Sequence, residues 1–272
     1  VVIAMSFKIA IVPFHMWTPD VYTGAPTPVT GFLSAAAKAA GFAVFVRVIL
    51  TGIPLENANW ENVFWILAVL SMTVGNLMAL RQSEIKRMLA FSSIAHAGYV
   101  MVALVVGSDS AISGVIFYSL AYAVMGTGAF GILTIKDAGR VPETYDDLAG
   151  YGVRNPLQAL MMTLFMFSLI GLPLTGGFIG KLQIFSAALN NGWVWLSVIG
   201  ILNSALSAYY YLRVVMFMYM REGALPEGKD STGRSSGFAL TGLIGTAVAV
   251  LYLGVFPDKI IELASSSIQA LL

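Results

Sequence analysis

Residues 6–29 read SFKIAIVPFHMWTPDVYTGAPTPV, an apolar stretch in which Lys8, His15 and Asp20 stand beside several prolines. Pro13 cannot donate the backbone hydrogen bond that a continuous helix needs at its position. Backbone groups freed at membrane depth are tolerated only inside protein or around a water-filled cavity. The stretch therefore predicts a broken helix with a polar pocket beside Lys8.

The composition of the whole chain indicates a membrane protein. Hydrophobic residues make up 58% of the 272 positions and charged residues only 11%, whereas soluble domains carry about 25% charged residues. A formal net charge of +1 gives no reason to expect a nucleic-acid partner. The lack of cysteine excludes disulfides, cysteine-held zinc and cysteine-ligated iron–sulfur clusters, and two histidines are too few for paired haem sites. We therefore expect neither a metal site nor a redox centre in this chain.

Apolar runs between charged or Gly/Pro-rich breaks divide the chain into eight segments, several of them long enough to cross a bilayer. The segments cover about 1–27, 28–52, 62–80, 88–107, 111–135, 156–190, 193–220 and 236–256. The sixth is too long for one straight crossing and contains GLPLTGGFIG at 171–180. We predict an all-α, polytopic bundle of eight crossings with discontinuous first and sixth helices. The opening VVIAMSFK lacks the basic start of a signal peptide and resembles the middle of a helix, so we expect further chain before Val1.

Positive charge is concentrated in loops that would share one side of the membrane. If the segments cross one by one, the loops at 81–87, 136–155 and 221–236 hold nine basic residues, against Lys259 alone on the other side. This bias follows the positive-inside rule. The basic side is expected to be cytoplasmic, in a bacterial plasma membrane or alternatively in an organelle inner or thylakoid membrane. The nine residues are Arg81, Lys86, Arg87, Lys136, Arg140, Arg154, Arg221, Lys229 and Arg234.

Three lysines fall inside the apolar segments, where an ionised lysine costs about 2.5–3.5 kcal/mol on insertion scales. Lys38 lies about ten residues from either end of its segment, while Lys8 and Lys181 each lie beside a predicted break. Burial disfavours the charged form of lysine, so a nearby charge can tip it between its two states, which suits proton carriage. The alternative is a snorkelling anchor with no further role, which fits Arg47 and Arg213 near segment ends.

The second predicted break has Pro173, Gly176 and Gly177 just before Lys181. This arrangement predicts a polar pocket of the kind that transporters build at broken helices. A simple kink is the alternative.

Both histidines lie in or near the apolar segments. His96 falls midway along the fourth segment, in FSSIAHAGY at 91–99, and is either a proton relay or a hydrogen-bonded packing residue. His15 is either a packing residue or orients its loop through Asp20. The residues alone leave these alternatives open.

Four longer motifs resemble one family. They are FKIAIVPFHMWTPDVYTGAPTPVTGFLSAAAKAAGF at 7–42, GNLMALRQSEIKRMLAFSSIAHAGY at 75–99, GLPLTGGFIGKLQIF at 171–185 and SAYYYLRVV at 207–215. In this order they are similar to the antiporter-like membrane subunits of proton-pumping NADH:quinone oxidoreductase, respiratory complex I, and the resemblance covers nearly the whole chain. Within the first motif, the PFHMWTPD…APTPV stretch is shared with the sister subunits, cation/proton antiporters and membrane-bound hydrogenases. The forms WTPDVY and YYYLRVV point to the subunit N family.

The resemblance implies an antiporter-like fold of two inverted repeats, each with a broken helix. It places the end of the first repeat at 1–52, the second repeat at 53–220, and a loop with a C-terminal transmembrane helix at 221–272. Lys8 and Lys181 would be the broken-helix lysines, Lys38 the connecting lysine, and His96 part of the polar axis between the repeats. In the family, a glutamate on an earlier helix pairs with the lysine at the position of Lys8. Supporting roles would fall to His15, Asp20, Pro13, Pro173, Gly176 and Gly177.

The function implied by the resemblance is proton translocation through a mid-membrane chain of lysines, histidine and water. It would be driven by redox chemistry in partner subunits, which would hold NADH, flavin, iron–sulfur clusters and quinone. The implied partners are the lipid bilayer, protons and other membrane subunits, including sister antiporter-like subunits. Two alternatives stay open. The chain would be a subunit of a cation/proton antiporter or membrane-bound hydrogenase, for which Asp20 is the only carboxylate in a candidate broken-helix region, or a scaffold whose lysines are satisfied by water.

Overall fold

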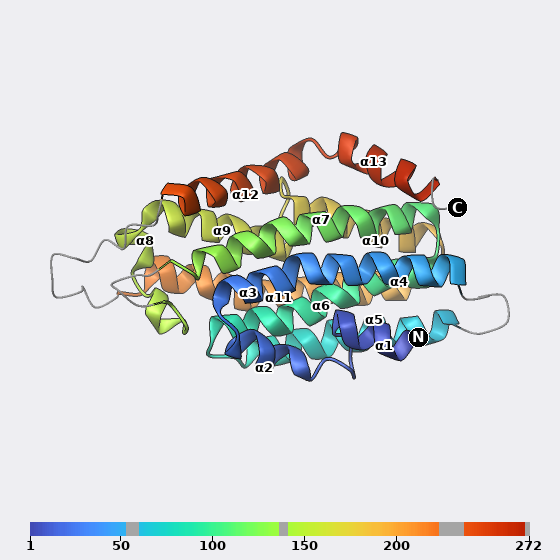
Figure 1. The fold of residues 1–272 in the computed structure, drawn as a ribbon, viewed down its shortest axis with the longest axis horizontal. Coiled ribbons are helices and arrows are strands. Elements are labelled where there is room, and N and C mark those ends of the chain that lie inside the picture. Colours follow the sequence, from blue (N-terminus) through green and yellow to red (C-terminus); the bar gives the residue numbers. More distant parts are fainter. Residues whose placement is uncertain (53–59, 136–140, 223–236, 270–272) are drawn as a thin grey trace.

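The computed structural model describes residues 1–52, 60–135, 141–222 and 237–269. Across these ranges every regular element is a helix, apart from a single antiparallel bridge between Glu84 and Thr144. The long helices run lengthwise beside one another, and α12 and α13 lie along one edge while α1 and α2 lie along the opposite edge (Figure 1). The prediction of an all-α bundle is confirmed.

Six helices of the described chain are long and apolar enough to cross a membrane, or seven if the bent pair formed by 146–154 and 156–170 is one span. They are the continuous α3–η1–α4 (Thr27–Phe32, Leu33–Ala37 and Lys38–Gly52), α5 (Trp60–Leu80), α6 (Ile85–Val106), α7 (Asp109–Ile132), α11 (Val194–Met220) and α12 (Gly237–Val255). The remaining elements are η3 (Asp146–Leu148), α8 (Tyr151–Arg154) and α13 (Asp258–Gln269). The first and sixth predicted segments are pairs of short helices: α1 (Val2–Ile9) with α2 (Trp17–Gly24), and α9 (Pro156–Ile170) with α10 (Gly176–Asn190).

Helix α6 forms the centre of the bundle, and every residue in the range 88–105 is buried. Two glycines allow the backbones of α5 and α6 to touch. A Cβ added at Gly75 would lie 2.7 Å from the backbone nitrogen of Ala95, and one at Gly98 would lie 2.6 Å from that of Met72. Small residues at close helix crossings are typical of membrane bundles, where packing replaces the hydrophobic effect between helices.

The first break lies where the sequence predicts it. Helix α1 ends before Ala10, which takes a left-handed conformation with φ 61°. The Val12–Pro13 peptide bond is cis, and α2 begins four residues after Pro13. The backbone N–H of Val12 donates to Ser71 Oγ of α5 over 3.1 Å. A neighbouring helix therefore satisfies a backbone group that the break leaves free.

The second break contains Pro173, whereas Gly176 and Gly177 are the first residues of α10 and not part of the interruption. Gly177 is required by close packing rather than by backbone flexibility. A Cβ added there would lie 1.9 Å from the Ser168 carbonyl oxygen of α9. The start of α10 is thus pressed against the end of α9.

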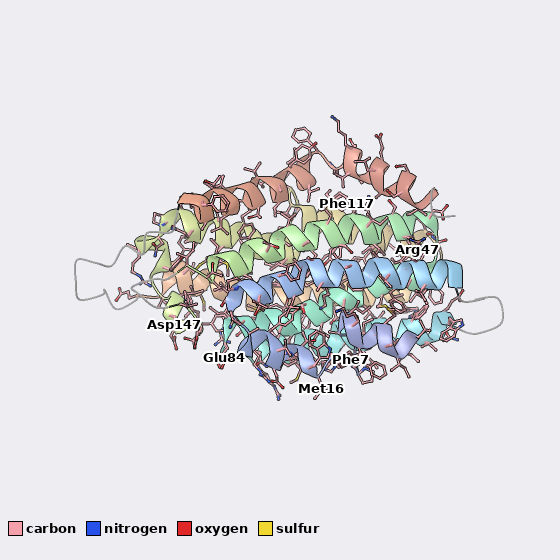
Figure 2. The ribbon with its side chains drawn as sticks, in the orientation of Figure 1. Phe7, Met16, Arg47, Glu84, Phe117 and Asp147 are labelled. Carbon is pink, nitrogen blue, oxygen red and sulfur yellow. The ribbon has the colours of Figure 1, made fainter. Side chains whose placement is uncertain are left out.

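Two of the predicted basic loops meet at one end of the bundle. The backbone N–H of Ile85 donates to the Glu143 carbonyl oxygen over 2.8 Å. Figure 2 shows Glu84 and Asp147 at this end and Arg47 toward the other. If the predicted segments cross the membrane one by one, the loops at 81–87 and 136–155 have to lie at the same end. Four of the nine basic residues lie outside the described ranges, namely Lys136, Arg140, Lys229 and Arg234.

Candidate functional site

Lys38 is held in the interior by α6. It is the first residue of α4, directly after the wider π-helical turn of η1, and only 5% of it is exposed. Its Nζ donates to the carbonyl oxygen of Ser93 over 2.6 Å and to Ser93 Oγ over 2.8 Å. Short π-helical turns frequently occur at functional sites. Lys38 is therefore buried and hydrogen-bonded to α6, and it is not a snorkelling anchor.

A small cavity is shared by Lys38 and His96. Its volume is about 10 Å³, which is room for about one water molecule. The Oγ of Ser119 is buried and has no hydrogen-bond partner in the part of the chain that the structure describes. Because an unpaired buried hydroxyl is costly, the cavity suits one hydrogen-bonded water. Its polar wall consists of Lys38, Ser93, His96, Tyr118, Ser119 and Tyr122.

Both ring nitrogens of His96 are hydrogen-bonded to tyrosines. Nδ1 pairs with the Tyr118 hydroxyl of α7, and Nε2 lies 2.9 Å from the Tyr211 hydroxyl of α11. The Tyr211 hydroxyl also pairs with Ser92 Oγ. In a neutral imidazole one nitrogen donates and the other accepts, whereas in the charged form both donate. Because a hydroxyl can donate or accept, this site accommodates either charge state of His96 by rotation of hydroxyl hydrogens.

Lys181 caps the carbonyl end of α9. Its Nζ donates to the carbonyl oxygens of Leu169 over 3.0 Å and Ile170 over 2.8 Å, and to Ser204 Oγ over 2.8 Å. A helical carbonyl normally accepts from the N–H four residues later, but Pro173, which occupies that place for Leu169, has none. The negative end of the helix dipole adds to the attraction. Pro173 therefore frees the oxygen that Lys181 binds.

A buried amide–hydroxyl network joins α5, α6 and α11. Asn76 Nδ2 donates to the Tyr99 hydroxyl over 3.3 Å and to the Asn203 carbonyl oxygen over 3.0 Å. The Tyr210 hydroxyl donates to Asn76 Oδ1 over 2.7 Å. Asn76 is fully buried, so these bonds replace the water that its amide would otherwise bind.

Lys8 lies apart from these groups. It is on α1, its side chain is exposed, and it passes Gly41 of α4. Within the described chain, α1 turns Ser6 and Ile9 inward and leaves Lys8 on its outer face, so the expected role of Lys8 stays a prediction. The structure gathers Lys38, His96 and Lys181 in the interior and leaves Lys8 outside this set.

His15 and Asp20 do not form a pair. Asp20 Oδ1 lies 2.8 Å from Nη1 of Arg87 at the start of α6, and Lys86 Nζ donates to the Ala25 carbonyl oxygen over 3.0 Å. His15 is buried, and its Nδ1 has no hydrogen-bond partner among the described residues. The expectation that His15 orients its loop through Asp20 is therefore wrong, and α6 holds this loop instead.

Sequence reasoning missed the tyrosines that surround the buried cations. Besides its place in the cavity wall, the Tyr122 hydroxyl lies 3.0 Å from Ser34 Oγ. A signal exists in hindsight, since Tyr118 and Tyr122 are four residues apart on one face of an apolar segment, and Tyr211 lies in the YYYLRVV motif. Among the residues described, no group of three or more His, Asp or Glu side chains is placed to hold a metal ion.

Comparisons with known proteins agree with this geometry. The family described as NADH:quinone oxidoreductase/Mrp antiporter, transmembrane, matches residues 1–207. The NADH-quinone oxidoreductase subunit N of Trichlorobacter lovleyi is 50% identical over 264 residues, which cover 97% of this chain and 54% of that protein. The subunit N 1 of Solibacter usitatus is 46% identical over 267 residues, again 97% of this chain and 54% of its own length. The chain thus spans about half the length of the curated relatives it matches.

Solved structures share the fold. A chain in respiratory complex I from Thermus thermophilus with bound aureothin superposes with a TM-score of 0.80 at 37% identity, over 95% of this chain and 56% of that one. A chain of the Mrp complex from a Dietzia species gives a TM-score of 0.84 at 22% identity, over 96% of this chain and 56% of that one. The likeness to the Mrp chain is one of fold alone. The two superpositions together confirm the antiporter-like fold expected from the motifs.

Proposed function

Because the chain belongs to the NADH:quinone oxidoreductase/Mrp antiporter transmembrane family, we propose that it is part of a proton-translocating membrane subunit of an NADH:quinone oxidoreductase. The observation that carries the proposal is the set of Lys38, His96 and Lys181, buried together inside an otherwise apolar bundle. Ionisable groups are expensive within a membrane and, where they occur, mark ion pathways.

In the proposed mechanism, protons move sideways through the middle of the bundle. A proton from Lys38 crosses the one-water cavity, where the Ser93 and Ser119 hydroxyls accept and donate, and reaches His96. From His96 it passes on to Lys181. A proton that arrives on one of these groups disfavours the charged form of the next, because like charges close together cannot both be retained at low cost. Redox chemistry in partner subunits supplies the charge displacement that starts the sequence.

The proposal keeps several features that the sequence predicts. Lys8 is the first carrier, and its exposed side chain is open to an acidic partner beyond the described residues. The proposal also includes the two inverted repeats and the division of the chain into 1–52, 53–220 and 221–272. The basic loops face the cytoplasm of a bacterial plasma membrane, in keeping with the bacterial relatives. NADH, flavin, iron–sulfur clusters and quinone belong to partner subunits, and this chain contributes no redox centre.

The cation/proton antiporter is the second candidate. Its cation ligands would be carboxylates, and Asp20 is the only one in a candidate broken-helix region. The Asp20 side chain is 73% exposed and is paired with Arg87, so the structure offers a salt bridge where a desolvated cation ligand would be needed. The geometry therefore favours proton carriage by lysine and histidine.

The test uses the full-length subunit in its complex, reconstituted in lipid vesicles. Lys38→Ala and Lys181→Ala should each lower the number of protons taken up per NADH oxidised. The matched control is Lys259→Ala, which removes an exposed lysine on α13 and should leave proton uptake at the parental value. Fully coupled pumping in the Lys181→Ala complex would overturn the assignment. Cation exchange in the absence of NADH and quinone would favour the antiporter.

A further inference from the structure

Tyr99 touches both His96 and Lys181. It lies one turn after His96 on α6 and is fully buried. The centre of its ring is 5.5 Å from that of His96, and the two rings are perpendicular. The Nζ of Lys181 lies 4.8 Å from the same ring centre. Two proton-carrying groups therefore contact one aromatic ring, and the carbon atoms of that ring cannot pass a proton.

The direct hydrogen bonds of His96 and Lys181 go to different neighbours. Those of His96 lead to Tyr118 and Tyr211, and from Tyr211 to Ser92. Those of Lys181 lead to the end of α9 and to α11 through Ser204. A longer chain of hydroxyls runs from Tyr211 through Tyr210 to Ser207, which donates to the Ser204 carbonyl oxygen. The ring of Tyr99 contacts both His96 and Lys181, so the direct route between them passes this ring.

The hydroxyl of Tyr99 is held by Asn76 and, more weakly, by Ser207. Asn76 is fixed in turn by the Asn203 carbonyl oxygen, at 3.0 Å, and by the Tyr210 hydroxyl, at 2.7 Å. The bond from Asn76 Nδ2 to Tyr99 is the longest of the three, at 3.3 Å. When the bond between Asn76 and Tyr99 breaks, the bonds of Asn76 to Asn203 and Tyr210 of α11 therefore keep its side chain in place. A latch requires such a fixed partner.

We propose that Tyr99 is a gate between His96 and Lys181, latched by Asn76, an inference that rests on the proposed proton transfer. A charged Lys181 is attracted to the face of the ring by a cation–π interaction. That attraction holds the ring in the path while Lys181 carries its proton. Loss of the proton removes the attraction, the ring is released, and the next proton passes. The gate thereby prevents a second proton from following and the first from returning.

The first test removes the ring. Tyr99→Leu opens space beside His96, Lys181 and Asn76, and a roomy polar space of this kind fills with water. The complex in vesicles under an imposed potential, without NADH, should then leak protons several-fold faster than the parent. Phe64→Leu is the matched control, because it also removes a buried ring, but one packed against Phe45 and Trp60. Equal leak in Tyr99→Leu and Phe64→Leu would overturn the gate.

The second test decides which route the leak takes. Combining Tyr99→Leu with Lys181→Met should return the leak to the parental rate, because the proton has lost its next carrier. A leak that persists in the double variant would bypass Lys181 and overturn the proposal.

Tyr99→Phe keeps the ring and loses only the latch, so it decides the matter should Tyr99→Leu fail to assemble. Its leak should lie between those of the parent and Tyr99→Leu, and a parental leak with parental pumping would count against the latch. Failure of the proposed function has a different signature, namely normal pumping in Lys38→Ala and Lys181→Ala.

Discussion

Replacing either buried lysine with methionine should impair function. The two variants should nevertheless differ in their free energy of unfolding. Methionine is apolar and of similar length, so the loss of a buried charge is common to both variants and cancels in the comparison. After Lys38→Met, Ser93 Oγ still donates to a carbonyl of α6 over 2.7 Å, and the Ser93 carbonyl oxygen keeps its helical partner. After Lys181→Met, the Leu169 carbonyl oxygen loses its donor, because Pro173 has no N–H to replace it.

The size of the difference follows from that one orphaned oxygen. A buried carbonyl without a donor costs about 1–3 kcal/mol. Lys181→Met should therefore be less stable than Lys38→Met by this amount, and its melting temperature should be lower. The assay heats the full-length subunit in its solubilised complex and measures the fraction that stays folded. Proton uptake per NADH is recorded on the same preparations.

Lys181→Arg is the matched control. Arginine can donate to the carbonyl oxygens at the end of α9, but it does not release its proton at physiological pH. Stability should therefore return toward that of the parent while proton uptake stays low. Equal melting temperatures of Lys38→Met and Lys181→Met would refute the capping argument, and parental pumping by Lys181→Arg would refute the relay.

Two further predictions concern packing and pH. Gly177→Ala should destabilise α9 against α10 by about 1–3 kcal/mol or more, since its Cβ would collide with the Ser168 carbonyl oxygen, and the melting temperature of the complex measures the loss. Burial raises the pKa of Tyr145 to about 12, although the neighbouring Arg213 guanidinium lowers it. The stability that this phenol contributes is therefore complete below about pH 10, where an unfolded tyrosine ionises, and is lost as the pH rises through about 12. A pH titration of tyrosinate absorbance, compared with that of Tyr145→Phe, should show that Tyr145 ionises at a higher pH than an exposed tyrosine.

The architecture was predictable because its signals are local. Hydropathy reports burial in lipid directly, so the segments at 62–80 and 88–107 agree closely with α5 (Trp60–Leu80) and α6 (Ile85–Val106). Proline acts on its own backbone and its immediate neighbours, so Pro13 and Pro173 mark both breaks without knowledge of any partner.

The contacts of the buried groups were not predictable in the same way. Helix α6 is apolar and buried on every side, so no polar face indicates which way His96 points. Its partners Tyr118 and Tyr211 are 22 and 115 positions away in sequence. The exposure of Lys8 in the described chain was not predictable for a similar reason, because an apolar sequence indicates membrane depth and not which side of α1 packs inward. The error over His15 arose from pairing it with a near residue, whereas the actual partner of Asp20 lies 67 positions away.

The glycine contacts between α5 and α6 limit how this protein can work. Gly75 of α5 and Gly98 of α6 bring the two backbones close together, and a shift of α6 along its axis would put a residue with a side chain in the place of Gly98, against the backbone of Met72. Ser93, His96 and Tyr99 all belong to this closely packed helix. The proposed relay therefore needs proton hops and side-chain rotations, and it does not need a shift of α6 along its axis.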